Sequence, residues 1–389
     1  MKRQKKNKDN FVRSLLKGLA ATGFSFVIVW VYAQIALNVS SLNPISEVIE
    51  NFSITDKYYQ MMPERESRSM TIVDLSSLYD RGDIALVLEE IEACRPAVVV
   101  MDCVFKGLKD SVGDNAIRQV AERYDNIVFS YELADEGTDG TGYRRSVHSF
   151  FSGEIPVHEG VANMQRDNIY SGIKRNLRLG WTTPDGMQLS MVGEAVNLYA
   201  GEDVVTAMDE DVNINFSPTR FPIIDPAEIS QFRDLIEGRI VFFGAMTDQK
   251  DMHYTPLGKL AGVELLAYSA QTLLEHSQVI RPGRLLHALI SIVLVLLTNI
   301  LQLLYLDWAE NNESPIIHHV MGSAYVLGVA TFLWIAVVMW ITFLLFNIYH
   351  LNIPIGWSLA AMAFLPTSRS FLAACEDYYT LWKRKQMKP

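Results

Sequence analysis

Four aspartates in the middle of the chain lie where a ligand or a cation could be held. Asp74 lies at the end of the apolar run MTIVDL, and Asp102 lies late in the β-branched run AVVVMDCVF. Asp114 begins a helix-like stretch, and Asp251 lies in a polar segment after another apolar run. Open α/β sheets hold ligands at the carboxyl ends of their strands. We therefore expect Asp74 and Asp102 on neighbouring strand ends, facing a crevice that Asp114 and Asp251 could join.

Two interpretations of these carboxylates remain open. Mg²⁺ and Ca²⁺ prefer oxygen ligands, so a cluster of acids suggests a divalent cation. Asp is also a favoured cap at turns and helix N-termini, in which case Asp74 and Asp102 only stabilise loops. We assign no metal ligand and expect no cofactor. His253 has no second histidine near it in the sequence that would complete a metal site.

Gly244 and Thr255 extend the predicted ligand site. Gly244 ends the strand-like run GRIVFFG and permits close approach of the backbone, and the segment Asp248–Pro256 could wrap the same crevice. The predicted ligand-binding residues are Asp74, Asp102, Asp114, Gly244, Asp251 and Thr255. The sequence has no Ser/His/Asp order, nucleophile elbow or phosphate loop, so we expect no catalytic residues and no enzyme activity.

The elements that must position these residues alternate between strand-like and helix-like runs. The run Ala97–Phe105 is nearly continuous in apolar residues, which is typical of a strand buried on both faces. With MTIVDL and Asn126–Leu133 it encloses two helical patterns, Ile84–Cys94 and Asp114–Tyr124. This order predicts an α/β domain with a mostly parallel sheet and flanking helices. The helical pattern Gly262–Ser277 closes the domain.

Charge is unevenly distributed along the 389 residues. Residues 1–37 carry a net charge of +6, residues 38–283 carry −17 and residues 284–389 carry +1, which together give −10. The acidic middle argues against nucleic-acid binding, because that function needs clustered Lys and Arg to neutralise phosphates.

Four apolar runs predict four transmembrane α-helices. These runs cover residues 15–39, 285–306, 321–346 and 352–372. The basic segments 1–14 and 373–389 are predicted to be cytoplasmic, which makes 40–283 an extracytoplasmic, periplasmic domain and 307–320 a cytoplasmic connector. The chain is thus expected to be a multi-pass protein of the cell inner (plasma) membrane, in contact with lipid. Pro366 is expected to kink or end the fourth helix. A cleaved secretion signal is the alternative for the first run.

The chain has three cysteines, Cys94, Cys103 and Cys375, in no zinc-binding spacing. Cys94 and Cys103 are the only two that could pair if the domain lies outside the cytoplasm. Two free, buried thiols are the other interpretation, since cysteine often serves as a small core residue.

Several stretches of the domain resemble one known family. They are TIVDLSSL, VVVMDCVF, GDNAIRQV and GVANMQRDNIYSGIKR, followed by LIEGRIVFFGAMTDQKDMHYTPLGKLAGVELLAYSA, which is the most specific. Together they resemble the CHASE-type extracytoplasmic sensor family, type two of that series, over about residues 45–280. Arg81 is the candidate counterpart of the arginine in the family's Trp-Pro-x-x-Arg stretch, and Leu266 replaces a family histidine.

The resemblance implies one span before the domain, three after it, and a sensory role. We expect a bacterial inner-membrane sensory or receptor-like protein whose domain binds an unknown extracytoplasmic small molecule or protein. Such domains usually feed a cyclase, kinase or phosphatase, and the tail CEDYYTLWKRKQMKP holds none. Output is therefore expected from a separate cytoplasmic or membrane signalling partner. A non-catalytic structural or scaffold subunit of a cell-envelope complex is the alternative, and either role is compatible with a homo-oligomer.

Overall fold

A computed structural model of the chain describes residues 16–32, 34, 54–136, 143–164, 172–183, 186–206, 211–310, 314, 320, 323–353 and 355–386. The chain separates into two compact units, Asp56–Val279 and the combination of Met1–Thr55 with Ile280–Pro389. The predicted basic segment 1–14, the stretch 35–53 and most of the predicted connector 307–320 lie outside the described residues. The predicted boundaries at 40 and 283 stay predictions.

The unit Asp56–Val279 is built on a seven-stranded sheet. Its order is β12-β2-β13-β3-β4-β5, with β6 also paired to β4. All neighbours run parallel except β4 and β5. The strands are β2 (Met70–Asp74), β3 (Val98–Met101), β4 (Ile127–Glu136), β5 (Tyr143–Val147), β6 (His158–Val161), β12 (Ile223–Ile224) and β13 (Ile240–Gly244). A mixed α/β domain is therefore confirmed.

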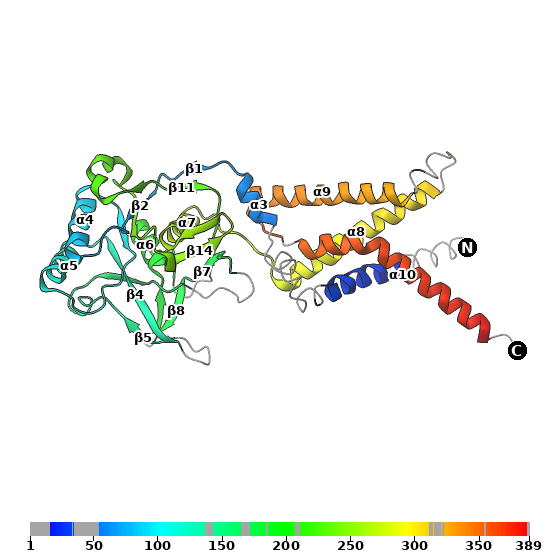
Figure 1. Cartoon of the computed structure of the whole chain (residues 1–389), viewed down its shortest axis with the longest axis horizontal. Coiled ribbons are helices and arrows are strands. Elements are labelled where there is room, and N and C mark those ends of the chain that lie inside the picture. Colours follow the sequence, from blue (N-terminus) through cyan, green and yellow to red (C-terminus); the bar gives the residue numbers. More distant parts are fainter. Residues whose placement is uncertain are drawn as a thin grey trace. The chain divides into compact units, whose positions relative to one another are not determined.

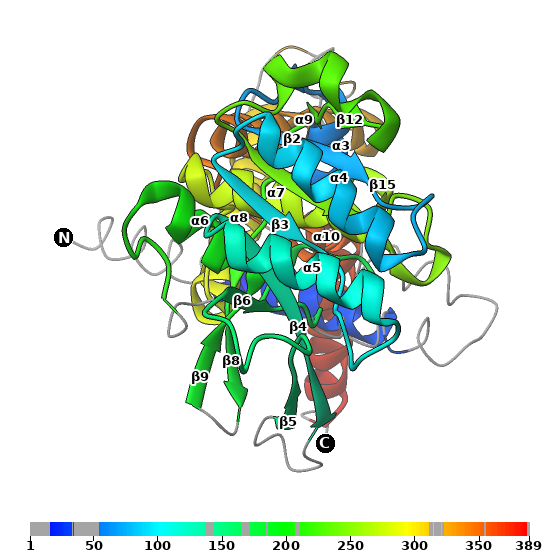
Figure 2. The same ribbon diagram turned by 90° about the vertical axis from the view of Figure 1, so that its left-hand side faces the viewer.

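Two layers of helices cover this sheet. Figure 2 shows α4 and α5 across one face and α6 and α7 behind the other. The helices are α4 (Arg81–Ala93), α5 (Ser111–Arg123), α6 (Met191–Ala200) and α7 (Gly262–Leu274). Side chains alternate along a strand, so Val241 and Phe243 of β13 pack in the cluster of α4 and α5, whereas Phe242 points to the opposite face. The sheet is therefore buried on both faces.

The position of β13 corrects one prediction. The order β2-α4-β3-α5-β4 is as expected, but β13 lies between β2 and β3 and pairs with both. Asp74 and Asp102 therefore do not lie on neighbouring strands. Gly244 pairs with Asp74, and the Asp102 N–H donates to Phe243 O at 3.0 Å.

Smaller elements complete the unit. The described residues of the unit also form four two-stranded ribbons, in which β1 pairs with β11, β7 with β10, β8 with β9 and β14 with β15. Their bounds are β1 (Arg65–Glu66), β7 (Asn176–Leu177), β8 (Gly180–Thr183), β9 (Gly186–Leu189), β10 (Val212–Asn213), β11 (Thr219–Arg220), β14 (Met252–Thr255) and β15 (Gly258–Ala261). The short helices are α3 (Ile54–Met61), η2 (Pro226–Leu235) and η3 (Gln249–Asp251). Cys94 and Cys103 are free thiols.

The other unit is helical. It holds the helix Leu16–Tyr32, α8 (Arg284–Glu310), α9 (Ala324–Tyr349) and α10 (Gly356–Gln386). Among the described residues, two helices are long and apolar enough to cross a membrane, over Leu285–Ala309 and Tyr325–Tyr349. Most of their apolar side chains are exposed, including Leu285 and Phe332, unlike the core helices of a soluble protein.

The prediction of four such helices is thus reduced to two. The described part of the first predicted span is a shorter apolar helix, Leu16–Tyr32. The fourth predicted span is polar around Arg369, which lowers its hydropathy. It also does not end at Pro366, because α10 continues through that residue to Gln386 (Figure 1).

Hydrogen bonds made by polar side chains of α8 connect the helices of this unit. The Asn299 amide of α8 donates to Gly18 O at 2.9 Å. The Gln302 amide donates to the Thr331 hydroxyl of α9 at 2.7 Å and accepts from Arg369 of α10 at 2.6 Å. Polar side chains are costly in an apolar environment unless they pair, so these bonds fix how the helices pack.

Gly160→Ala is expected to destabilise the domain. Gly160 of β6 lies against the start of α6, where a Cβ would be 2.3 Å from Met191 Cα. Because both groups belong to the backbone, the overlap is relieved only by moving β6 from α6, at a cost of about 3 kcal/mol. This corresponds to a Tm about 6–12 °C lower for a domain of this size. Thermal unfolding of the full chain in detergent measures the change.

Gly153→Ala is the matched control. A Cβ at Gly153 meets no atom within 4 Å, so its Tm should stay close to that of the unaltered protein. Equal Tm values for the two variants would contradict the close packing of β6 on α6.

Candidate functional site

Asp74 joins two loops at the carboxyl edge of the sheet. Its Oδ1 accepts hydrogen bonds from Ser76 N at 2.9 Å and Ser76 Oγ at 2.6 Å. The same oxygen accepts a bond from Met246 N at 3.1 Å. The carboxylate therefore holds the loop after β2 against the loop after β13, as a cap does.

Gly244 lies between the two aspartates and is required by packing. A Cβ on this residue would be 2.9 Å from Val263 Cγ2 and 3.0 Å from Asp102 Cβ. The missing side chain lets the first turn of α7 approach the ends of β13 and β3. Gly244 was predicted to admit a ligand, and the close neighbour in the structure is α7.

Asp102, Asp251 and His253 form a polar cluster at this edge, next to the start of α7. His253 Nε2 lies 3.1 Å from Asp251 Oδ1. The Asp251 carboxyl lies over Gly262, the first residue of α7, where a Cβ would be 2.0 Å from Asp251 Oδ2. Gly262 thus leaves room for a carboxylate at a helix N-terminus, where negative charge is favoured.

Asp102 has an unusual titration for a carboxyl. Desolvation and, to a lesser extent, the neighbouring Asp251 carboxyl raise the pKa of Asp102 to about 7, against the opposing effect of His253. A group with this pKa exchanges its proton near neutral pH, which is typical of functional sites. The cluster can bind a hydrogen-bond donor or change charge with pH.

Thr255 closes the turn between β14 and β15. Its hydroxyl donates to Gly258 O at 2.8 Å and accepts from Leu257 N at 3.2 Å. The side chain is buried, and its hydroxyl serves the turn both as donor and as acceptor. Its contact with a ligand stays a prediction.

Asp114 forms a separate, buried ion pair with Arg81. Asp114 also accepts a bond from Lys109 N at 2.9 Å, and the Arg81 guanidinium lies 5.0 Å from the centre of the Phe150 ring. Desolvation opposes ionisation of Asp114, but the bonds from Arg81 and Lys109 outweigh it and hold the pKa of that carboxyl below its usual value. The pair ties the first turn of α4 to the first turn of α5.

The structure therefore brings together only part of the predicted site. Asp102, Asp251 and Gly244 converge next to α7, whereas Asp74 and Asp114 are held by hydrogen bonds of their own. The described residues contain no group of three His, Cys, Asp or Glu side chains able to hold a metal ion. Sequence reasoning missed the place of His253 in the cluster, although its partner Asp251 lies only two residues away in the chain.

Asp102→Asn is expected to remove a pH dependence of stability. The folded state keeps the Asp102 proton up to a pKa of about 7, well above the ordinary value of 3.8. Ionisation therefore costs folding free energy: stability from this group is complete below pH 4 and is lost as the pH rises to about 7, by about 2–4 kcal/mol. Asparagine cannot ionise, so the stability gain of the variant should grow between pH 5 and pH 8.

Unfolding by urea at several pH values, on the full chain in detergent, measures this difference. Asp203→Asn, at an exposed loop position, is the matched control. Glu92 has a pKa raised to about 7 by burial and adds a slope of the same sign. Only the difference between Asp102→Asn and the unaltered chain is therefore diagnostic, and parallel curves would contradict the interpretation of the cluster.

The comparisons with known proteins give one match. The CHASE2 domain family matches residues 26–306. The searches found no match among the curated proteins and none among the solved structures. The family match covers more than half of the 389 residues and includes the whole α/β unit. The chain therefore belongs to the CHASE2 domain family, an extracellular sensor domain family that is typical of signalling receptors.

Proposed function

We propose that the chain is a sensory, receptor-like protein of the bacterial inner membrane, and that its α/β unit binds a ligand outside the cytoplasm. Membership of the CHASE2 family and the two long apolar helices support this proposal. The ligand is a small molecule or a protein, and the role involves no catalysis by this chain.

The observation that carries the proposal is the short connection between α7 and α8. Ten of the thirteen residues of α7 are buried. Only residues 275–283 separate this helix from α8. Within that stretch Val279 N donates to Asn213 O at 3.1 Å, and the next residue, Ile280, donates to His350 O at 2.9 Å. Each unit thus holds its own end of the connector, so a shift of α7 would pass to α8 with little slack.

Two described helices are long and apolar enough to cross a membrane, α8 and α9, and we propose that two further helices insert beside them. The helix Leu16–Tyr32 and α10 are bound to α8 by the bonds of Asn299 and Gln302, which supports their insertion beside it. Pro366 inside α10 fits this, because neighbouring helices compensate for the hydrogen bond that proline removes from a membrane helix. Both termini then lie in the cytoplasm, where a separate signalling partner receives the output.

The proposed topology predicts that Cys375 reacts from the cytoplasmic side alone. Cys375 of α10 is exposed, whereas Cys94 is buried. In a chain carrying Cys94→Ala and Cys103→Ala, a membrane-impermeant maleimide should label Cys375 only after spheroplasts are permeabilised. Tyr79, which is 88% exposed in the α/β unit, gives the matched control. Tyr79→Cys in a chain that also carries Cys375→Ala should react in intact spheroplasts. Labelling of Cys375 in intact spheroplasts would overturn the topology.

The sensory role predicts a signalling protein among the partners. Crosslinking in cells, followed by purification of the full chain in detergent and mass spectrometry, should enrich a protein with a kinase, cyclase or phosphatase domain over an unrelated membrane protein used as bait. Four residues inserted after Gly283 should leave this capture intact but change the partner's basal activity, because the added slack interrupts the connector. Recovery of envelope-assembly proteins alone would contradict the sensory role and favour the scaffold alternative.

A further inference from the structure

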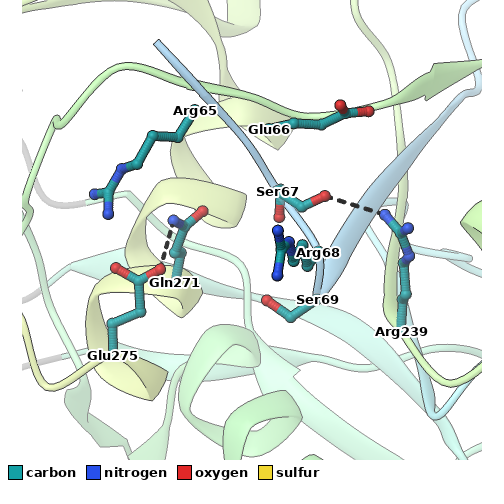
Figure 3. A pocket seen from close by; sticks show the side chains of 8 residues that line it. All are labelled: Arg65, Glu66, Ser67, Arg68, Ser69, Arg239, Gln271 and Glu275. Carbon is teal, nitrogen blue, oxygen red and sulfur yellow. Dashed lines mark hydrogen bonds between the residues drawn. The ribbon is translucent and has the colours of Figure 1, made fainter. Parts of the chain in front are cut away.

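A second polar site lies at the amino-terminal edge of the sheet, where the strands begin. It is a pocket of about 690 Å³. The chain from β1 to the start of β2 forms one wall, and the last turn of α7 forms another (Figure 3). None of the sequence-predicted ligand residues lines it.

Three arginines give this pocket its charge. Arg65, Arg68 and Arg239 line it, against the carboxylates of Glu66 and Glu275. This excess of positive charge stands out in a segment whose net charge is −17. Arg239 is held by the chain, since its Nη1 donates to Ser67 O at 3.1 Å.

Arg65 and Arg68 are exposed and face the pocket without a partner. Across the described ranges, neither guanidinium has a carboxylate within 4.0 Å or another hydrogen-bond acceptor. Figure 3 shows Arg65 extended toward the ends of Gln271 and Glu275. Guanidinium groups bind carboxylate and phosphate in a two-point geometry, and two of them around one hollow suit a small oxyanion.

Gln271 adds a hydrogen-bond acceptor to the arginine donors of this pocket. Its Nε2 donates to Glu275 Oε1 at 2.8 Å, which fixes the orientation of the amide because the reverse would place two oxygens together. Its Oε1 is buried and accepts no hydrogen bond from the described residues. A buried acceptor without a donor is costly, so this oxygen favours a ligand that carries a hydroxyl.

We propose that this pocket binds a small oxyanion that also bears a hydroxyl group, such as a hydroxycarboxylate or a phosphate ester. Arg65 and Arg68 bind the carboxylate or phosphate oxygens, and the ligand hydroxyl donates to Gln271 Oε1. The glycerol phosphate headgroup of a lipid has the same chemistry, so the ligand is either a free solute or a lipid.

Such a ligand would bridge the first strand and the last helix of the α/β unit. β1 follows α3 after residues 62–64, and Gln271 lies in the last turn of α7, before the connector to α8. Binding at this pocket therefore acts on the segment that carries the proposed signal. The inference deepens the proposed function and rests on it for its biological meaning, whereas the binding itself is measured independently.

Isothermal titration of the full chain in neutral detergent tests the site with four probes: citrate and glycerol 3-phosphate, and their analogues without a hydroxyl, tricarballylate and propyl phosphate. The chain should bind citrate or glycerol 3-phosphate. The double variant Arg65→Gln, Arg68→Gln should weaken that binding by at least about tenfold, because each charged hydrogen bond is lost. Arg220→Gln, at an exposed position of β11 outside the pocket lining, is the control for the loss of a nearby positive charge and should change the affinity by less than about twofold.

Gln271→Leu tests the hydroxyl contact. The unaltered chain should prefer each hydroxyl-bearing probe over its analogue, and this variant should abolish the preference while keeping the thermal stability. Nanodiscs of phosphatidylglycerol, against phosphatidylcholine, identify the source. If phosphatidylglycerol competes with the soluble probes, the site is assigned to a lipid headgroup. If it does not compete, the site is assigned to a free solute.

Failure of citrate and glycerol 3-phosphate to bind would overturn the inference, as would equal binding by the double arginine variant. Neither result contradicts the proposed sensory role, because the capture of a signalling partner tests that role separately. Conversely, binding without any change in partner activity would keep the site and contradict its place in signalling.

Discussion

One buried strand, β13, determines how the chain packs at both ends of the parallel strands in the α/β unit. All five residues of β13 are buried, and its backbone pairs with β2 on one side and β3 on the other. Phe242 and Phe243 point to opposite faces and anchor both helical layers, each contributing about 2–3 kcal/mol by burial. Without β13, the strands that carry Asp74 and Asp102 would have no common neighbour.

The ends of β13 also set the geometry of the two polar sites. At its carboxyl end, Gly244 admits the first turn of α7, which brings Gly262 under the Asp251 carboxyl. At its amino end, Arg239 lines the basic pocket together with Gln271, in the last turn of the same helix. A helix of thirteen residues spans about 20 Å, so α7 connects a cluster that titrates near neutral pH with a pocket that attracts anions.

The sequence predicts those features that local patterns encode. The runs that became β2, β3 and β4 are apolar over short stretches, and the helices between them have helical spacing, so their order followed from neighbouring residues alone. The insertion of β13 could not be predicted in this way, because sheet order depends on pairing between residues more than a hundred positions apart. For the same reason the local pattern wrongly predicts that Asp74 and Asp102 lie on adjacent strands. The pocket lined by Arg65 and Gln271 also joins distant segments, as do the hydrogen bonds of α8. No local spacing of residues predicts either of them. Proline in a sequence predicts a kink or an end of the helix, yet α10 continues through Pro366 to Gln386.

The helical unit limits how the proposed signal can travel. α8 holds Gly18 through Asn299, and holds Thr331 and Arg369 through Gln302. Rotation of α8 by a fraction of a turn would break these bonds in surroundings that offer few replacements, and each polar group left unpaired there is costly. Gradual rotation is therefore disfavoured, and movement between discrete arrangements that repair the bonds is favoured, as in other packed interfaces with two stable states. A ligand that shifts α7 would thus need only to change the balance between two such arrangements of α8.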